Sequence, residues 1–228
     1  MTWSLPFTRD QFFATFAAYN EAIWPVHVAA YVLGLAAVIL AARWPERRFT
    51  RVFVVSALAA MWAWTAVAYH LFFFSRINEA ALGFGVLFLV QAAILVLAGV
   101  RRQLRFGRPP PLDAVVGISL AAYALFFYPL IGVLAGARAE TTPMFGVTPC
   151  PVTIFTFGIL LLTHGRLPWS VSVVPVLWAG IGGSAAVLLG VAQDWALPFG
   201  AALYLALALR RAFASEVNRN AGSSESSQ

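Results

Sequence analysis

Long apolar stretches, separated by short polar segments, dominate the hydrophobic pattern of the chain. Seven of them stand out, over residues 23–42, 52–74, 80–100, 114–136, 148–163, 171–192 and 195–209. Five reach the roughly 20 residues that a helix needs to cross about 30 Å of hydrocarbon, whereas the fifth and the seventh are shorter. The pattern predicts an all-α fold, a polytopic transmembrane bundle of about seven helices, with six spans as the alternative.

The composition agrees with a membrane protein. Of the 228 residues, 61% are hydrophobic and 11% are charged, whereas soluble domains are about 45–50% apolar and about 25% charged. The net charge of +6 would also fit a nucleic-acid-binding protein, but the basic residues fall in short segments between apolar stretches. We therefore expect the lipid bilayer as a partner and no nucleic acid.

The distribution of arginine predicts the orientation of the chain, which contains no lysine. Twelve of the 15 basic residues fall in alternate loops and in the tail, within residues 43–51, 101–108, 166 and 210–219. The remaining three are Arg9, Arg76 and Arg138. Cytoplasmic loops of membrane proteins carry an excess of basic residues. We therefore expect the N-terminus outside and the C-terminus in the cytoplasm.

The pattern also predicts how the chain is organised. Its three parts are an extracytoplasmic amphipathic helix at 1–22, a seven-helix bundle at 23–210 and a cytoplasmic tail at 211–228 with a disordered, serine-rich end. Thr8 and Gln11 fit a capping box, and Phe7 and Phe12 fit the hydrophobic staple around it, so the first helix should begin at Thr8. That helix would lie on the membrane surface or pack on the bundle as a lid.

Polar side chains within the apolar stretches are candidates for function, because they are costly in a membrane. Many such residues only form hydrogen bonds between helices. By the predicted topology, a set of them converges on the extracytoplasmic half and would line a polar vestibule. The set consists of Tyr69, Asn78, Tyr128, Thr148, Thr153, Gln193 and Asp194.

A metal site is one hypothesis for the same half of the bundle. His27, His70 and Cys150 offer imidazole and thiolate, which suit copper or zinc. Cys150 lies between Pro149 and Pro151 at a predicted helix start, where the helix dipole favours a thiolate. The alternative is that Cys150 is an inert packing residue and that the histidines form structural hydrogen bonds. The sequence indicates no particular cofactor.

Several short segments, spread over nearly the entire chain, carry a resemblance to a known family. They are Pro6-Phe7, Gln11-Phe12, Tyr19-Asn20, Trp62-Ala63-Trp64, Tyr69-His70, Phe145-Gly146-Val147-Thr148-Pro149-Cys150-Pro151 and Gly182-Gly183-Ser184-Ala185-Ala186. The chain resembles a family of uncharacterised bacterial polytopic membrane proteins that is classed as a domain of unknown function, and its Thr-Pro-Cys-Pro segment is the most specific part. The resemblance implies a multi-pass protein of the bacterial cytoplasmic (inner) membrane and no established activity.

Three functions stay open. The first is a transporter or channel for a small solute or an ion, including a transition-metal ion; no acidic residue lies deep in a predicted span, which argues against a proton-coupled pump. The second is a noncatalytic accessory or sensor subunit with a membrane partner or a second copy, docked through the N-terminal helix or the small residues Gly182, Ala186 and Gly190. The third is an intramembrane enzyme with Cys150 as nucleophile and His70 as base, although the chain has no CxxC or HExxH motif.

Overall fold

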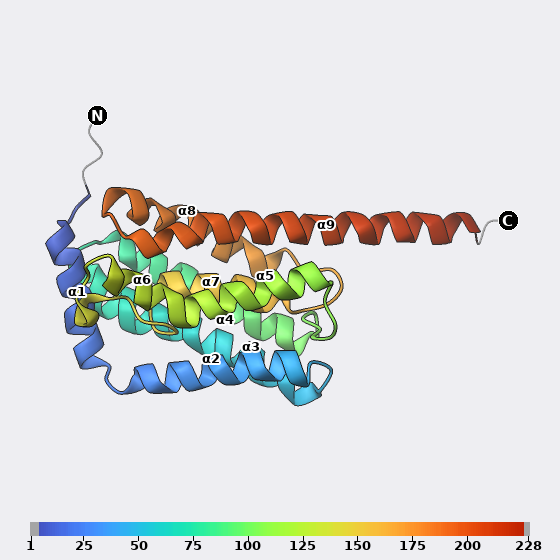
Figure 1. Cartoon of the computed structure of the whole chain (residues 1–228), viewed down its shortest axis with the longest axis horizontal. Coiled ribbons are helices and arrows are strands. Elements are labelled where there is room, and N and C mark those ends of the chain that lie inside the picture. Colours follow the sequence, from blue (N-terminus) through green and yellow to red (C-terminus); the bar gives the residue numbers. More distant parts are fainter. Residues whose placement is uncertain (1–4, 226–228) are drawn as a thin grey trace.

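The structure, a computed structural model, describes residues 5–225, and the chain is 78% helical with no strand in that part. Figure 1 shows the helices side by side, with α1 across one end. The main helices are α1 (Arg9–Ala22), α2 (Val26–Arg43), α3 (Arg48–Trp64), α4 (Ala80–Val100), α5 (Pro111–Ala122), α6 (Tyr128–Leu134), α7 (Pro149–Leu161), α8 (Ser170–Leu188) and α9 (Ala196–Glu225). The π-helical segment η1 (Thr65–Phe73) and the turn η2 (Phe74–Arg76) continue α3, and the π-helical segment η3 (Tyr123–Phe127) joins α5 to α6.

Six helical stretches in the described part are long and apolar enough to cross a membrane. They are Val26–Arg43, Arg48–Arg76, Ala80–Val100, Pro111–Leu134, Ser170–Leu188 and Ala192–Ala214. These stretches confirm the predicted all-α architecture, and the last is longer than the apolar stretch that predicted it. The fifth predicted stretch corresponds to α7, which has only 13 residues and is about 20 Å long.

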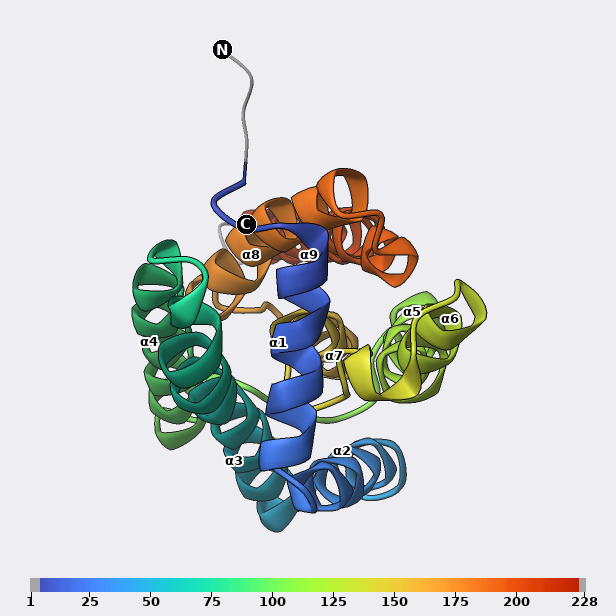
Figure 2. The same ribbon diagram turned by 90° about the vertical axis from the view of Figure 1, so that its left-hand side faces the viewer.

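Helix α7 lies at the centre of the bundle, with the other long helices around it (Figure 2). Almost all of its residues are buried. One of its ends meets the α4–α5 loop, in which Leu104 and Phe106 are buried; Phe106 pairs with Thr163, and the His164 N–H donates to the Arg105 carbonyl at 2.8 Å. Because protein covers this end, its backbone avoids contact with hydrocarbon even though the helix is short.

Helix α1 crosses the other end of the bundle (Figures 1 and 2). The predicted capping box is confirmed: the Gln11 N–H donates to Thr8 Oγ1 at 3.2 Å, and the Thr8 N–H donates to Gln11 Oε1 at 2.8 Å. The rings of Phe7 and Phe12 stack with their centroids 5.9 Å apart, as the staple predicts. Phe12 and Phe16 are buried, so α1 packs as a lid.

The buried side chain of Tyr19 fastens this lid to the bundle. Its hydroxyl donates to the Val147 carbonyl at 2.7 Å and accepts from Trp64 Nε1 at 2.9 Å. Burial raises the pKa of the Tyr19 phenol, which therefore stays protonated and keeps its donor. The lid is thus bonded both to α3 and to the segment that leads into α7.

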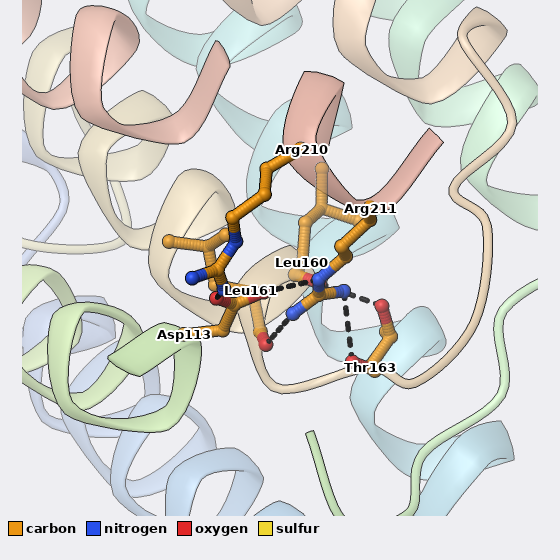
Figure 3. A network of polar contacts seen from close by, with 6 residues as sticks. All are labelled: Asp113, Leu160, Leu161, Thr163, Arg210 and Arg211. Atoms are coloured by element: carbon orange, nitrogen blue, oxygen red, sulfur yellow. Dashed lines mark hydrogen bonds and ion pairs between the residues drawn. The ribbon is translucent and has the colours of Figure 1, made fainter. Parts of the chain in front are cut away.

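A buried charge network closes the opposite end of the bundle (Figure 3). The Asp113 carboxylate is fully buried and accepts from both Arg210 and Arg211. The Arg211 guanidinium also donates to the Leu161 carbonyl at 2.6 Å and to the Thr163 carbonyl at 2.9 Å. These carbonyls lie at the C-terminal end of α7, where a helix leaves its last acceptors unsatisfied. Arg211 therefore caps the central helix as well as pairing with Asp113.

Helix α9 extends past the end of the bundle (Figure 1). The boundary expected between bundle and tail, at residues 210–211, falls inside this helix. Residues 1–4 of the expected N-terminal segment and residues 226–228 of the expected disordered end lie outside the described part, and the backbone is helical as far as Glu225.

Candidate functional site

A cavity of about 150 Å³ lies beneath the lid. A cavity of about this volume accommodates a ligand the size of benzene. Most of its wall is apolar, and its aromatic residues are Phe7, Phe12, Phe16, Tyr69, Phe74, Phe84, Tyr128 and Trp178. Its other polar residues are Asn78, Cys150, Ser184 and Asp194. The cavity therefore combines a wall of rings with a few polar groups, as small-molecule sites commonly do.

Two π-helical segments bring tyrosines to this cavity. Tyr69 belongs to η1, and Tyr128 follows directly after η3. Such segments are rare and are frequent at functional sites. Pro129 has no N–H to donate to the Leu125 carbonyl, which explains a wider turn at η3. For η1 the local sequence gives no such reason.

The carboxyl of Asp194 is the most unusual group on the wall. Asp194 lies in the single turn η5 (Ala192–Trp195) before α9 and is only 2% exposed. Its Oδ1 accepts from the Tyr128 hydroxyl at 2.5 Å, and the Cys150 thiol lies beside both groups. Among the side chains that the structure describes, no basic one forms a salt bridge with Asp194. Because an unpaired buried carboxylate is costly, this group either keeps a proton or binds a cation.

A weakly paired donor faces the same space. Trp178 is buried on the cavity wall, where its Nε1 lies beside the Cys150 thiol and has no oxygen or nitrogen acceptor. A β-carbon at Gly182, one turn further along α8, would lie 2.9 Å from this nitrogen. The glycine therefore keeps the indole N–H accessible. Since buried polar groups are almost always paired, this N–H is a candidate donor to a ligand in the cavity.

His70 lies behind the aromatic wall. It is fully buried, and its ring centroid is 4.7 Å from that of Phe88 and 5.2 Å from that of Trp178. Neither ring nitrogen has a hydrogen-bond partner, so His70 is not bonded to the Cys150 thiol. The thiol–imidazole pair that an enzyme would need is not formed in this structure.

His27 takes part in the hydrogen bonds that hold α1 on the bundle. Its Nε2 is 3.2 Å from Asn20 Oδ1, and Asn20 Nδ2 donates to the carbonyls of Glu140 and Thr142, both at 2.9 Å. Within the described residues, no group of three or more His, Cys, Asp or Glu side chains is arranged to hold a metal ion. The metal site assigned to His27, His70 and Cys150 is therefore not assembled here and stays a prediction.

The residues predicted to form a vestibule divide into two groups. Tyr69, Asn78, Tyr128 and Asp194 line the cavity together with Cys150. The other three bond elsewhere: Thr148 Oγ1 donates to the Met144 carbonyl at 2.7 Å, Thr153 Oγ1 donates to the Pro149 carbonyl at 2.8 Å, and the Gln193 carbonyl accepts from the Tyr123 hydroxyl at 3.0 Å.

Sequence reasoning missed the aromatic wall, above all Trp178. A tryptophan inside an apolar stretch is equally typical of a lipid-facing or a packed position, so its chemistry gives no signal. The one usable hint is the spacing of Trp178 and Gly182, which places a small residue on the same helix face one turn away.

The chain matches the family model described as "Family of unknown function (DUF6064)" over residues 9–219. This range includes α1, the whole bundle and every polar residue of the cavity. Neither a curated protein nor a solved structure matches the chain.

Proposed function

We propose that this chain, which belongs to the DUF6064 family of unknown function, is a multi-pass carrier that binds a small organic cation in the cavity beneath α1. One observation carries the proposal: the buried Asp194 carboxyl has no cationic partner in the described part of the chain. A small cation is the ligand that would compensate this charge.

The rest of the wall favours an organic cation over a metal ion. A calcium ion takes six to eight oxygen ligands, whereas the cavity offers one carboxyl and a few single polar groups. Aromatic faces attract cations by about 2 kcal/mol or more when water is excluded. Phe74, Phe84 and Trp178 supply such rings on the wall of the cavity that Asp194 also lines. The volume of about 150 Å³ suits an ion such as methylammonium or trimethylammonium.

The arginine distribution supports an orientation with α1 and the cavity on the extracytoplasmic side of a bacterial cytoplasmic membrane. The cavity would then receive solute from outside. Buried side chains of α7, including Phe155 and Phe157, fill the bundle below it, which favours a carrier with a moving barrier over an open channel.

The first test is a charge-neutral substitution at the carboxyl. Asp194→Asn should weaken the binding of trimethylammonium at least about 30-fold, roughly 2 kcal/mol, because a carboxylate about 4 Å from a cation contributes up to about 4 kcal/mol near a protein surface. Isothermal titration calorimetry on purified protein in detergent measures the affinity. Asp10→Asn makes the same chemical change on the exposed side of α1 and should leave the affinity unaltered.

Two further comparisons sharpen this test. Tert-butanol, a neutral molecule of similar shape, should bind much more weakly than the cation. If Asp194→Asn binds trimethylammonium as tightly as the wild type, the proposal fails. Uptake of labelled cation into liposomes that contain the protein alone then distinguishes a carrier from an accessory or sensor subunit. A carrier moves the cation into the vesicle, whereas a sensor binds the cation without flux.

A further inference from the structure

A second cleft lies at the end of the bundle opposite the lid, where the α2–α3 loop, the α4–α5 loop and the segment after α7 meet. Its volume is about 290 Å³. The lining residues are Pro45, Glu46, Arg47, Arg51, Arg102, Arg105, Phe106 and His164. We call it the arginine cleft. The α2–α3 loop and the first turn of α3 bring Arg47 and Arg51 to this depression, and the α4–α5 loop brings Arg102 and Arg105.

The charge of the arginine cleft is left almost uncompensated. Its one carboxylate is that of Glu46, and none of the four arginines forms a salt bridge with another described side chain. Guanidinium groups that line one cleft repel one another, and an anion between them would turn that repulsion into charge-assisted hydrogen bonds. Arginine presents a planar fork of donors that matches the geometry of phosphate.

The backbone at Arg102 points to a role for its side chain. Helix α4 ends in a Schellman motif, in which the N–H of Arg102 donates to the Gly99 carbonyl and that of Gln103 donates to the Ala98 carbonyl. Arg102 itself has φ 53°, the left-handed conformation for which glycine is usual at this position. The chain carries an arginine here despite that strain, and the arginine lines the cleft.

From these observations we infer that the arginine cleft binds the phosphate of an anionic phospholipid headgroup. Exposed apolar side chains on α4, the helix that leads to Arg102, favour a lipid over free phosphate. Val96 and Val100, one turn apart on α4, are exposed, and Val100 directly precedes the arginines of the loop. Acyl chains can follow this exposed face of α4 while the phosphate sits among the guanidinium groups. The site is independent of the cation cavity and does not rest on its function.

The test uses the full chain, purified in a nonionic detergent, and phosphatidylglycerol as the probe. Native mass spectrometry measures how much lipid stays bound. The double variant Arg102→Gly/Arg105→Gln should weaken phosphatidylglycerol binding about 30-fold, since each arginine near an anionic surface contributes about fivefold. Glycine relieves the left-handed strain at position 102, so this variant should fold at least as well as the wild type.

The matched control removes the same charge from the other end of the molecule. Arg76→Gln/Arg138→Gln should leave phosphatidylglycerol binding unaltered, because neither residue lines the arginine cleft. Phosphatidylcholine should bind weakly to all three proteins. If phosphatidylglycerol binding is weakened equally in both double variants, or in neither, the assignment of the binding site to the arginine cleft is wrong. Inorganic phosphate that displaces the lipid at an equal concentration would overturn the assignment to a lipid.

Discussion

Asp113→Ala is expected to lower the free energy of unfolding by about 3–5 kcal/mol, the usual cost of removing one partner of a buried ion pair. Asp113 is fully buried, and only 6% of the Arg211 side chain is exposed. Without the carboxylate, the Arg211 charge stays in the bundle with only the Leu161 and Thr163 carbonyls as partners. Unfolding in mixed micelles with a rising fraction of dodecyl sulfate, followed by circular dichroism, measures the change.

An exposed ion pair supplies the control for this prediction. Glu140 pairs with Arg138, and their side chains are 51% and 80% exposed. Glu140→Ala should therefore cost less than about 1 kcal/mol. The double variant Asp113→Ala/Arg211→Met removes both buried charges and should recover part of the loss. A cost for Asp113→Ala as small as that for Glu140→Ala would show that the network does not stabilise the fold.

Gly158→Ala is expected to lower the free energy of unfolding by about 2–3 kcal/mol, at the upper end for an overpacked core. A β-carbon at Gly158 would lie 2.7 Å from the Gly117 carbonyl oxygen and 2.8 Å from the Ala121 backbone nitrogen. A backbone cannot rotate away as a side chain can, so α5 and α7 must separate. The same measurement of unfolding in mixed micelles tests this prediction.

Gly180→Ala is the matched control. Gly180 lies inside α8 with nothing within 4 Å of its β-carbon position, so alanine there should be neutral or stabilising by up to about 1 kcal/mol. If Gly158→Ala also proves neutral, then α5 and α7 do not approach as closely as this structure has them. Because α7 carries Cys150 to the cavity, Gly158→Ala should also weaken cation binding, whereas Gly180→Ala should not.

The overall architecture could be predicted from the sequence because lipid demands long apolar helices, and composition reveals such helices directly. The start of α1 could be predicted because Thr8 and Gln11 are local signals. The central position of α7 could not be predicted, since a residue that faces lipid and one that faces protein are equally apolar. The small residues around Gly182 are conspicuous in the sequence, whereas the close approach of the α5 and α7 backbones at Gly117 and Gly158 has no such signal.

The polar residues of the candidate site could be predicted from the sequence, but the shape of the cavity could not. Asn78, Tyr128 and Asp194 are conspicuous in apolar surroundings, and the predicted topology places them in the same half of the bundle. The pairing of Asp113 with Arg211 joins positions 98 apart, and neither residue lies in a motif. The η1 segment, which carries Tyr69, also has no local sequence signal. Such features depend on which helices meet.

The fastening of α1 bears on how fast the cavity can exchange its contents. Tyr19 is bonded to Val147, only three positions before Cys150, so the same short segment holds the lid and forms the cavity wall. Lifting α1 breaks that bond together with those of Asn20 to Glu140 and Thr142. For a solute that enters and leaves beneath α1, as the proposed function implies, arrival and departure then share one barrier. Loosening Tyr19 would shorten the residence time of a bound solute and speed its arrival by the same factor, with its equilibrium affinity unchanged.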